Sequence, residues 1–293
     1  MNNCSKNCRR DKIGKWYDIV KKNLNTEHFL IRKSSFQKKT GGIYDIRLNT
    51  DSGVLRKFNS VSDIINTRVT AENKLHYLYL NSAKKCHNGN CAKYSVTSIY
   101  LNFRYTNNNW DLQCEKDEFN VGLCGDPILH YAAEQLSGAI REAKLLHENS
   151  CCLAIHLGLT FNDTFQKSTH ANTLFVNTNC KTISHFEPQG KLIHFNISQV
   201  TDLQYRVEDT LSKICKEIGY KYTGYMTPYC NFQDDNPEFC YLWTTWVELL
   251  AVLNPWIIPK NITKYLEYRY KKLKSRSSRG ELAVMFAMYL REI

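Results

Sequence analysis

The chain has 293 residues, 43% of them hydrophobic and 12% aromatic, and a formal net charge of +11 at pH 7. This composition is typical of a folded protein with one sizeable core and excludes a wholly disordered chain. No apolar run reaches the roughly 18 residues needed to span a bilayer, and the first ten residues lack the apolar core of a signal peptide. We therefore expect a soluble, intracellular protein that is not secreted.

The positive charge is concentrated at the two ends of the chain. Residues 1–75 contain 16 Lys and Arg against 7 Asp and Glu, and residues 260–293 contain 9 against 3, which leaves a net charge of −4 between them. Basic segments attract nucleic acid, acidic proteins or anionic membranes by long-range electrostatics. A solvated surface that aids solubility explains the same charge equally well, because charge alone specifies no partner.

This pattern suggests three regions. Residues 1–85 form a basic N-terminal region, either continuous with the rest or a separate subdomain, in which residues 12–22 and 61–66 could each start a helix. Residues 86–259 form the predicted core. Residues 260–293 form a basic C-terminal extension of two helices, over 262–274 and 281–292, divided by a polar segment rich in Ser and Arg.

The core opens with a short segment that offers a weak metal site. Cys86-His-Asn-Gly-Asn-Cys91 holds two thiols and an imidazole, but a structural zinc site needs four ligands. The nearest additions, Cys114 and Cys124, have no motif-like spacing from the first pair, and Asn88-Gly89 favours a hairpin turn. We predict a turn here and no metal.

The next elements alternate between strand and helix patterns. Residues 94–105 are strand-like, a helix is expected from Pro127 to about Glu148, and the continuous apolar run over 151–159 predicts a buried strand. After a predicted hairpin, residues 200–218 form an amphipathic helix that ends at Gly219, and residues 220–226 form a short strand. This alternation predicts an α+β fold with a central mixed sheet flanked by helices.

The predicted hairpin runs from His170 to Glu187. The segments 170–177 and 182–187 are rich in β-branched and aromatic residues, and Asn177-Thr-Asn-Cys180 reads as a tight turn. With Thr178 and Asn179 as the two central turn residues, His170 would pair directly with Glu187. A carboxylate there can accept the imidazole N–H and stabilise the imidazolium. Asn172, on the same strand face, is an alternative partner for the imidazole.

Other histidines compete with His170 as a candidate base. The strongest rival is His185, which shares the strand face of Glu187, but it is adjacent along the same strand and not across the turn. Each of the others could be a structural histidine: His130, His147, His156 and His194.

A cysteine opens the most apolar helix of the chain. The turn-rich run over 231–239 precedes Cys240, after which residues 240–253 have helical spacing. The expected buried stripe of this helix is Leu242, Trp246, Leu249, Leu250 and Leu253. A thiol at the first turn of a helix faces unsatisfied N–H groups that favour the thiolate, and Gln233 in the preceding loop can donate to an oxyanion.

The chain holds 12 cysteines, which are scattered and have no secretory signal. We therefore expect reduced thiols and no disulfide framework. Six cysteines are assigned this way: Cys4, Cys8, Cys151, Cys152, Cys180 and Cys215.

The order His170, Glu187, Gln233, Cys240 resembles the adenain-like cysteine peptidases (clan CE), which include the adenovirus maturation protease and the deSUMOylating ubiquitin-like-protein proteases. The separations of seventeen residues from His170 to Glu187 and seven from Gln233 to Cys240 match this pattern. The phrases His170-Ala-Asn172 and Phe186-Glu-Pro-Gln-Gly190 are similar to thiol proteases of large DNA viruses. The resemblance covers roughly residues 125–255, with specific motifs in two short pieces.

The resemblance implies a papain-like, adenain-type core with Cys240 as nucleophile, His170 as general base and acid, Glu187 as its orienter and Gln233 as oxyanion donor. It implies no required cofactor, with DNA as a candidate activator, and cleavage after small residues such as Gly-Gly. The chain departs from the pattern at Ala171, where many relatives carry Trp. It departs again at Phe239 and Tyr241, which flank the thiol where a Gly is frequent.

Three functions follow from this resemblance. The first is a viral endopeptidase that processes structural polyproteins during virion maturation, located in the virion and at assembly sites in the host cytoplasm. The second is an isopeptidase that removes ubiquitin or a ubiquitin-like modifier from host proteins. The third is a catalytically inactive virion component that binds DNA or protein through its basic ends.

Overall fold

The computed structural model describes most of the predicted core and parts of both ends. The described residues are 24–36, 42–49, 99–107, 109–113, 115–116, 122–123, 126–146, 152–163, 167–190, 200–226, 232, 240–254, 257–271, 285–286, 288–289 and 292. Predictions on residues 12–22 and 61–66 and on the Cys86–Cys91 turn fall outside these ranges.

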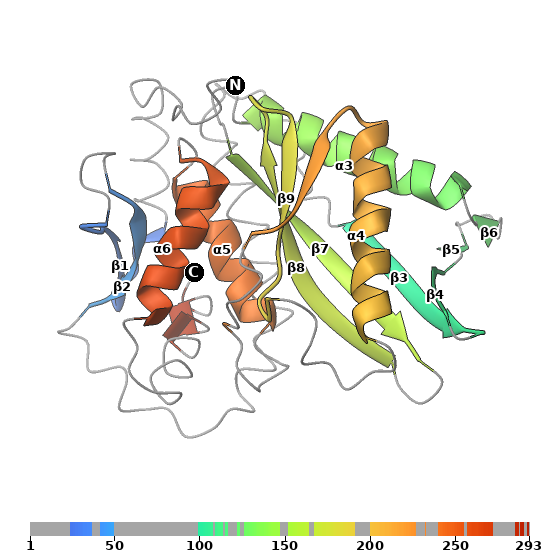
Figure 1. Cartoon of the computed structure of the whole chain (residues 1–293). Helices are drawn as coiled ribbons and strands as arrows, with labels where there is room; N and C mark the ends of the chain where they lie inside the picture. The colour runs from blue at the N-terminus through green and yellow to red at the C-terminus, as the bar shows by residue number, and fades with distance from the viewer. Residues whose placement is uncertain are drawn as a thin grey trace.

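A six-stranded mixed sheet is the centre of the molecule (Figure 1). Its strands, in spatial order, are β10 (Lys221–Tyr225), β9 (Thr182–Phe186), β8 (Lys167–Asn177), β7 (Cys152–Asn162), β3 (Ile99–Thr106) and β4 (Asn109–Leu112). The β3–β7 and β9–β10 pairs are parallel, and the other three pairs are antiparallel. The predicted mixed sheet is confirmed.

Each parallel pair is joined through a helix, as parallel pairing requires. Helix α3 (Asp126–Leu146) lies between β3 and β7 in the chain, and α4 (Val200–Glu217) lies between β9 and β10. Gly219 ends α4 with a φ of 74°, a value that glycine adopts without a steric penalty. The sequence predicted both helices to within two residues at each end.

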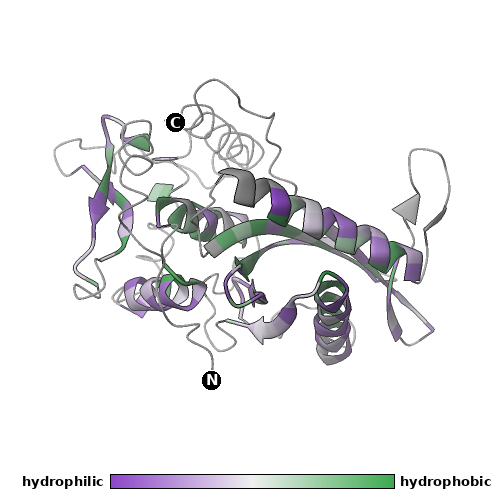
Figure 2. Ribbon diagram, turned by 90° about the horizontal axis from the view of Figure 1, so that it is seen from above, coloured by the Kyte–Doolittle hydropathy of each residue, from purple (hydrophilic) through white to green (hydrophobic). Residues whose placement is uncertain are grey.

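The two faces of the sheet belong to two cores. Leu174 and Val176 of β8 pack in a core with α3 and α4, while Ala171 and Phe175, which alternate with them, pack in a core with α5 (Cys240–Leu253). Figure 1 shows the sheet between α4 and the α5–α6 pair, and Figure 2 shows it from above as a curved band. Helix α5 thus lies on the face opposite α4.

Helix α5 is buried more completely than its pattern predicted. All its side chains that the structure describes are buried, including Thr244, Thr245 and Glu248, which lie outside the predicted stripe. The stripe was too narrow because neighbours distant in sequence cover the polar side of this helix. Because α5 is packed on every side, the position of its first residue, Cys240, is fixed by the core.

Described segments from both basic regions of the chain pack against α5. The hairpin β1 (Phe29–Lys33) and β2 (Tyr44–Leu48) shares one core with α5, α6 (Pro259–Lys271) and the helical residues Phe286 and Tyr289. Helix α6 begins three residues before the predicted helix over 262–274. Described residues of the predicted N-terminal region, within 24–36 and 42–49, thus contribute to the same core as α5 and α6.

A small antiparallel pair, β5 (Glu115–Lys116) and β6 (Gly122–Leu123), leads into α3. Among the described residues no helix is both long and apolar enough to cross a bilayer.

Candidate active site

Cys240 lies at the first residue of α5, where the sequence predicted it. Its side chain is 3% exposed. The N–H groups in the first turn of a helix have no hydrogen-bond partner within the helix. They are therefore available to a group that binds beside the thiol.

His170 and Glu187 meet at the edge of the sheet. The imidazole Nε2 of His170, on β8, hydrogen-bonds to Oε1 of Glu187, which directly follows β9. The same Oε1 accepts the backbone N–H of Gln189 at 2.9 Å. With Nε2 committed to the carboxylate, Nδ1 is the ring atom left to face the thiol of Cys240, with which His170 forms a hydrogen bond.

The predicted register of this hairpin is wrong by two residues. Strand β8 ends at Asn177 and pairs there with Thr182, so the connection is a four-residue loop and not a two-residue turn. Asn177 Oδ1 accepts the N–H of Cys180 in this loop, and Lys181 adopts a φ of 49°. The ladder places Asn172 level with Glu187, and His170 reaches the carboxylate diagonally on the same face.

Helix α5 forms hydrogen bonds to β8 just beyond the end of the β8–β9 ladder. Thr173 and Phe186 are the last pair of the β8–β9 ladder, and Pro188, which would face Ala171, has no N–H to donate. The N–H of Ala171 instead hydrogen-bonds to the thiol of Cys240, and its carbonyl accepts a hydrogen bond of 3.0 Å from Thr244 Oγ1. The Ala171 peptide group thereby fixes the first turn of α5 against the strand that carries His170.

The site stabilises a thiolate and an imidazolium. Burial would raise the pKa of Cys240, but the charge and hydrogen bond of His170 and the Ala171 N–H outweigh it, so the thiol pKa is lowered. Burial would likewise lower the pKa of His170, but the charges and hydrogen bonds of Glu187 and Cys240 raise it to about 10. An ion pair is therefore the favoured state near neutral pH.

The two rival residues pair with each other. His185 Nε2 donates to Asn172 Oδ1 at 2.7 Å, and the imidazole stacks on Tyr225 with ring centroids 4.7 Å apart. Burial and then the charge of His170 lower the pKa of His185 to about 3, so it stays neutral. The structure therefore places Glu187, and not Asn172, beside the imidazole that contacts the thiol.

Gln233, the predicted oxyanion donor, and the flanking Phe239 lie outside the described residues. Phe232, which precedes Gln233 in the sequence, donates its backbone N–H to the carbonyl of Pro188 at 2.8 Å, one residue from Glu187. The other flanking residue, Tyr241, is buried with its ring edge-on to His156, 6.0 Å between centroids.

A second polar cluster lies on the face of the sheet that α5 covers. Glu248 Oε1, two turns along α5 from Cys240, accepts a hydrogen bond from Thr173 Oγ1 at 3.1 Å and lies 3.2 Å from His156 Nδ1. The sequence indicated that His156 could be a structural histidine but gave no sign of these partners. The spacing of Thr244 and Glu248, four and eight residues after Cys240, was the available signal.

One cysteine prediction is corrected. Cys180, in the β8–β9 loop, is disulfide-bonded, whereas Cys215 and Cys240 are free. The scattered spacing of the cysteines hid this bond, because proximity in the fold and not in the sequence decides pairing. Within the described ranges no group of three or more His, Cys, Asp and Glu side chains is placed to hold a metal ion.

No known protein family matches the sequence, and no curated protein does either. Distantly similar solved structures include the following two. The C-terminal protease domain of Ulp1 in complex with Smt3, the yeast ortholog of SUMO, is 9% identical, with 99% of each chain covered and a TM-score of 0.30. The Legionella pneumophila effector RavZ is 12% identical, with 91% of this chain and 72% of that chain covered and a TM-score of 0.31. At these TM-scores neither likeness carries an argument about function.

Proposed function

We propose that this protein is a cysteine peptidase with Cys240 as nucleophile, His170 as general acid and base, and Glu187 as the residue that orients and charges the imidazole. One observation carries the proposal: the buried thiol, imidazole and carboxylate form a continuous hydrogen-bonded series at the N-terminus of a helix. This is the arrangement that nucleophilic acyl transfer requires.

The reaction follows from these contacts. The Cys240 thiolate attacks the scissile carbonyl, and the N–H groups at the start of α5, with Gln233 proposed as a side-chain donor, stabilise the oxyanion. The imidazolium of His170 gives its proton to the leaving amine as the C–N bond breaks. His170 then takes a proton from water, which attacks the thioester, releases the carboxylic acid and restores the thiolate.

The adenain-type fold and the substrate are part of the proposal. The mixed sheet, with the base on a strand and the nucleophile at a helix start, fits that fold. Viral structural polyproteins and ubiquitin-like conjugates are the two substrate classes, since either presents an extended chain at the scissile bond. Processing of polyproteins would place the protein in virions and at assembly sites in the host cytoplasm.

The test compares two buried free cysteines of the same chain. Cys215 is the matched control, because burial raises the pKa of its thiol to about 12. We expect an electrophilic thiol probe near neutral pH to label Cys240 well before Cys215, with labelling slowed in His170→Ala. Each protein is also incubated with peptides containing Gly-Gly, with ubiquitin-like reporter conjugates, and with or without DNA.

Cleavage that is lost in both Cys240→Ala and His170→Ala would support the peptidase, and the preferred reporter would identify the substrate class. Equal labelling of Cys240 and Cys215 without cleavage, with or without DNA, would contradict it. Salt-sensitive DNA binding that survives Cys240→Ala would then favour the inactive binding protein.

A further inference from the structure

The sheet continues beyond the end of α5 that carries Cys240. Along α5, Thr244 contacts Ala171, and Glu248 contacts Thr173 and lies against His156. The helix therefore starts over the row formed by Gly158 and Ala171 and runs toward the row of His156 and Thr173. In the opposite direction the same face continues through the rows of Thr160 with Thr169 and of Asn162 with Lys167.

Small residues line the first part of this face. Gly158 is the neighbour of Ala171 on one side and of Tyr100 on the other. Tyr100 is 56% exposed, and its ring lies across Gly158 so closely that a Cβ at this position would be 2.5 Å from the ring atom Cδ1. The ring therefore fills the space above Gly158, and its exposed surface can contact a chain that follows this face.

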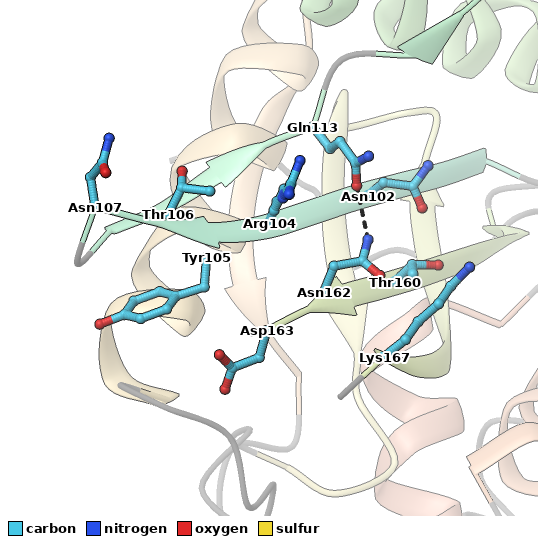
Figure 3. Close-up of a pocket in the computed structure, with 10 residues that line it drawn as sticks. All are labelled: Asn102, Arg104, Tyr105, Thr106, Asn107, Gln113, Thr160, Asn162, Asp163 and Lys167. Atoms are coloured by element: carbon cyan, nitrogen blue, oxygen red, sulfur yellow. Dashed lines mark hydrogen bonds between the residues drawn. The ribbon is translucent and has the colours of Figure 1, made fainter. Parts of the chain in front are cut away.

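A polar cavity of about 770 Å³ follows at the far end of the face (Figure 3). Asn162 Nδ2 donates to Gln113 Oε1 at 2.8 Å across the cavity wall, and Figure 3 shows Arg104 and Lys167 on either side of this bond. Asp163 and Tyr105 also line the cavity, but they point the other way in Figure 3, as strand alternation requires.

The two cations of this cavity have no counterion among the residues that the structure describes. Arg104 and Lys167 are both exposed, and neither forms an ion pair with any residue that the structure describes. Asp111, which faces Arg104 across the β3–β4 pair, instead accepts a hydrogen bond from Asn109 at 3.3 Å. The cavity therefore presents a guanidinium and an ammonium to any bound group.

We propose that this cavity binds an acidic side chain of the polypeptide substrate, with Arg104 and Lys167 as its charged ligands. The inference rests on the peptidase function proposed above. Four residues of strand, roughly 13 Å, separate Ala171 from Lys167 and Gly158 from Asn162. An extended substrate chain that follows this face thus carries its acidic residue about four positions from the scissile bond.

The test uses fluorescent peptides with a central Gly-Gly and a single glutamate, placed at roughly the second to the sixth position on either side. Matched peptides carry glutamine or lysine at the same place. Binding is measured by anisotropy with the Cys240→Ala protein, so that no cleavage is needed. We expect glutamate near the fourth position on one side to bind on the order of tenfold tighter than glutamine, a difference lost at high salt.

Charge reversal gives the decisive comparison. In the Cys240→Ala background, Arg104→Glu with Lys167→Glu should abolish the preference for glutamate and favour the lysine peptide. Arg141→Glu, an exposed cation of α3, is the matched control and should change nothing. No preference for glutamate at any position, or the same loss in the Arg141 control, would overturn the inference.

These outcomes are independent of the catalytic test. If Cys240 proves unreactive while the glutamate preference is seen and reversed, the peptidase fails and the acidic-peptide site stands. If the peptides are cleaved without any preference for glutamate, the peptidase stands and the cavity inference fails.

Discussion

Cys215 and Cys240 are both buried thiols, and their surroundings move their pKa values in opposite directions. At Cys215 burial acts alone and raises the pKa. At Cys240 the same penalty is outweighed by His170 and by the Ala171 N–H. The two thiol pKa values differ because of neighbouring groups in the fold, which the position of a cysteine in the sequence does not reveal. The residue types and their order predicted His170, Glu187 and Cys240, whereas Ala171 acts through its backbone and leaves no signal in the sequence.

The orienting role of Glu187 can be tested against Asn172. We expect Glu187→Gln to lower kcat/KM on the order of 100-fold or more. The neutral amide no longer stabilises the positive charge of the His170 imidazolium, so the imidazole binds its proton less tightly. Asn172→Ala should have a much smaller effect, since Asn172 bonds to His185. Equal losses in the two variants, measured with one peptide substrate, would contradict the assignment.

The two perturbed pKa values predict a bell-shaped pH profile. Thiolate forms as pH rises through the lowered pKa of Cys240, so activity should rise below the ordinary thiol pKa. Because the His170 pKa is raised to about 10, the proton needed by the leaving amine is held at neutral pH and lost as pH rises through that value. The check is kcat/KM across the range. A falling limb near the ordinary histidine pKa of 6.5 would be inconsistent with it.

At the scale of elements, local sequence patterns predicted the helices that they determine. They did not predict the strand register or the hairpin, which depend on loop conformation and distant contacts. Helices α3 and α4 follow from apolar periodicity, with Pro127 at the first turn of one and Gly219 after the other. The β8–β9 register was wrong because its loop depends on an Asn177 side-chain bond and on Lys181 at positive φ, which a lysine rarely adopts. The hairpin of β1 and β2 went unassigned because its core partners lie more than 200 residues away.

The contact between α5 and β8 should support the thiolate. Thr244→Val keeps the shape of the side chain but leaves the buried Ala171 carbonyl without its donor, which costs about 1–3 kcal/mol. We expect the Ala171 peptide to shift, the pKa of Cys240 to rise and alkylation near neutral pH to slow.

The matched variant is Thr244→Ser, which keeps the hydroxyl and should restore the pH dependence of alkylation. If Thr244→Val lowers the melting temperature without moving that pH dependence, Thr244 supports the fold and not the nucleophile.

At the scale of the whole molecule, a buried acidic residue joins the two ends of the chain to α5. Asp45 of β2 accepts hydrogen bonds from Trp246 Nε1 at 3.0 Å and from Tyr265 Oη at 2.6 Å, and it pairs with Arg269 of α6. The Arg269 guanidinium also lies 5.1 Å from the centre of the Trp246 ring. The described residues of β2 and α6, one from each basic region, are therefore part of the core around the helix that begins at Cys240.

Removal of this charge should destabilise the protein strongly. In Asp45→Asn the largely buried Arg269 loses its counterion, and we expect the free energy of unfolding to fall by about 3–5 kcal/mol. The control is Asp209→Asn, which breaks a solvent-exposed pair with Lys213 one turn along α4 and should cost about 1 kcal/mol or less. Urea denaturation of the two variants makes the comparison, and similar losses would contradict the role given to Asp45.

The packing of both ends around α5 also sets the order of events during synthesis. Tyr289 donates to the carbonyl of Leu24 at 3.2 Å, a contact between residues 265 positions apart. The ribosome synthesises the chain from its N-terminus, so Leu24 and the β1–β2 hairpin emerge long before the residues that they contact. They remain without these contacts until the segment that contains Tyr289 has been made. The helix of Cys240 gains its full cover only after residue 289 has left the exit tunnel. The thiol proposed as nucleophile is thus among the last parts of the molecule to reach its final surroundings, and a nascent chain carries no assembled site.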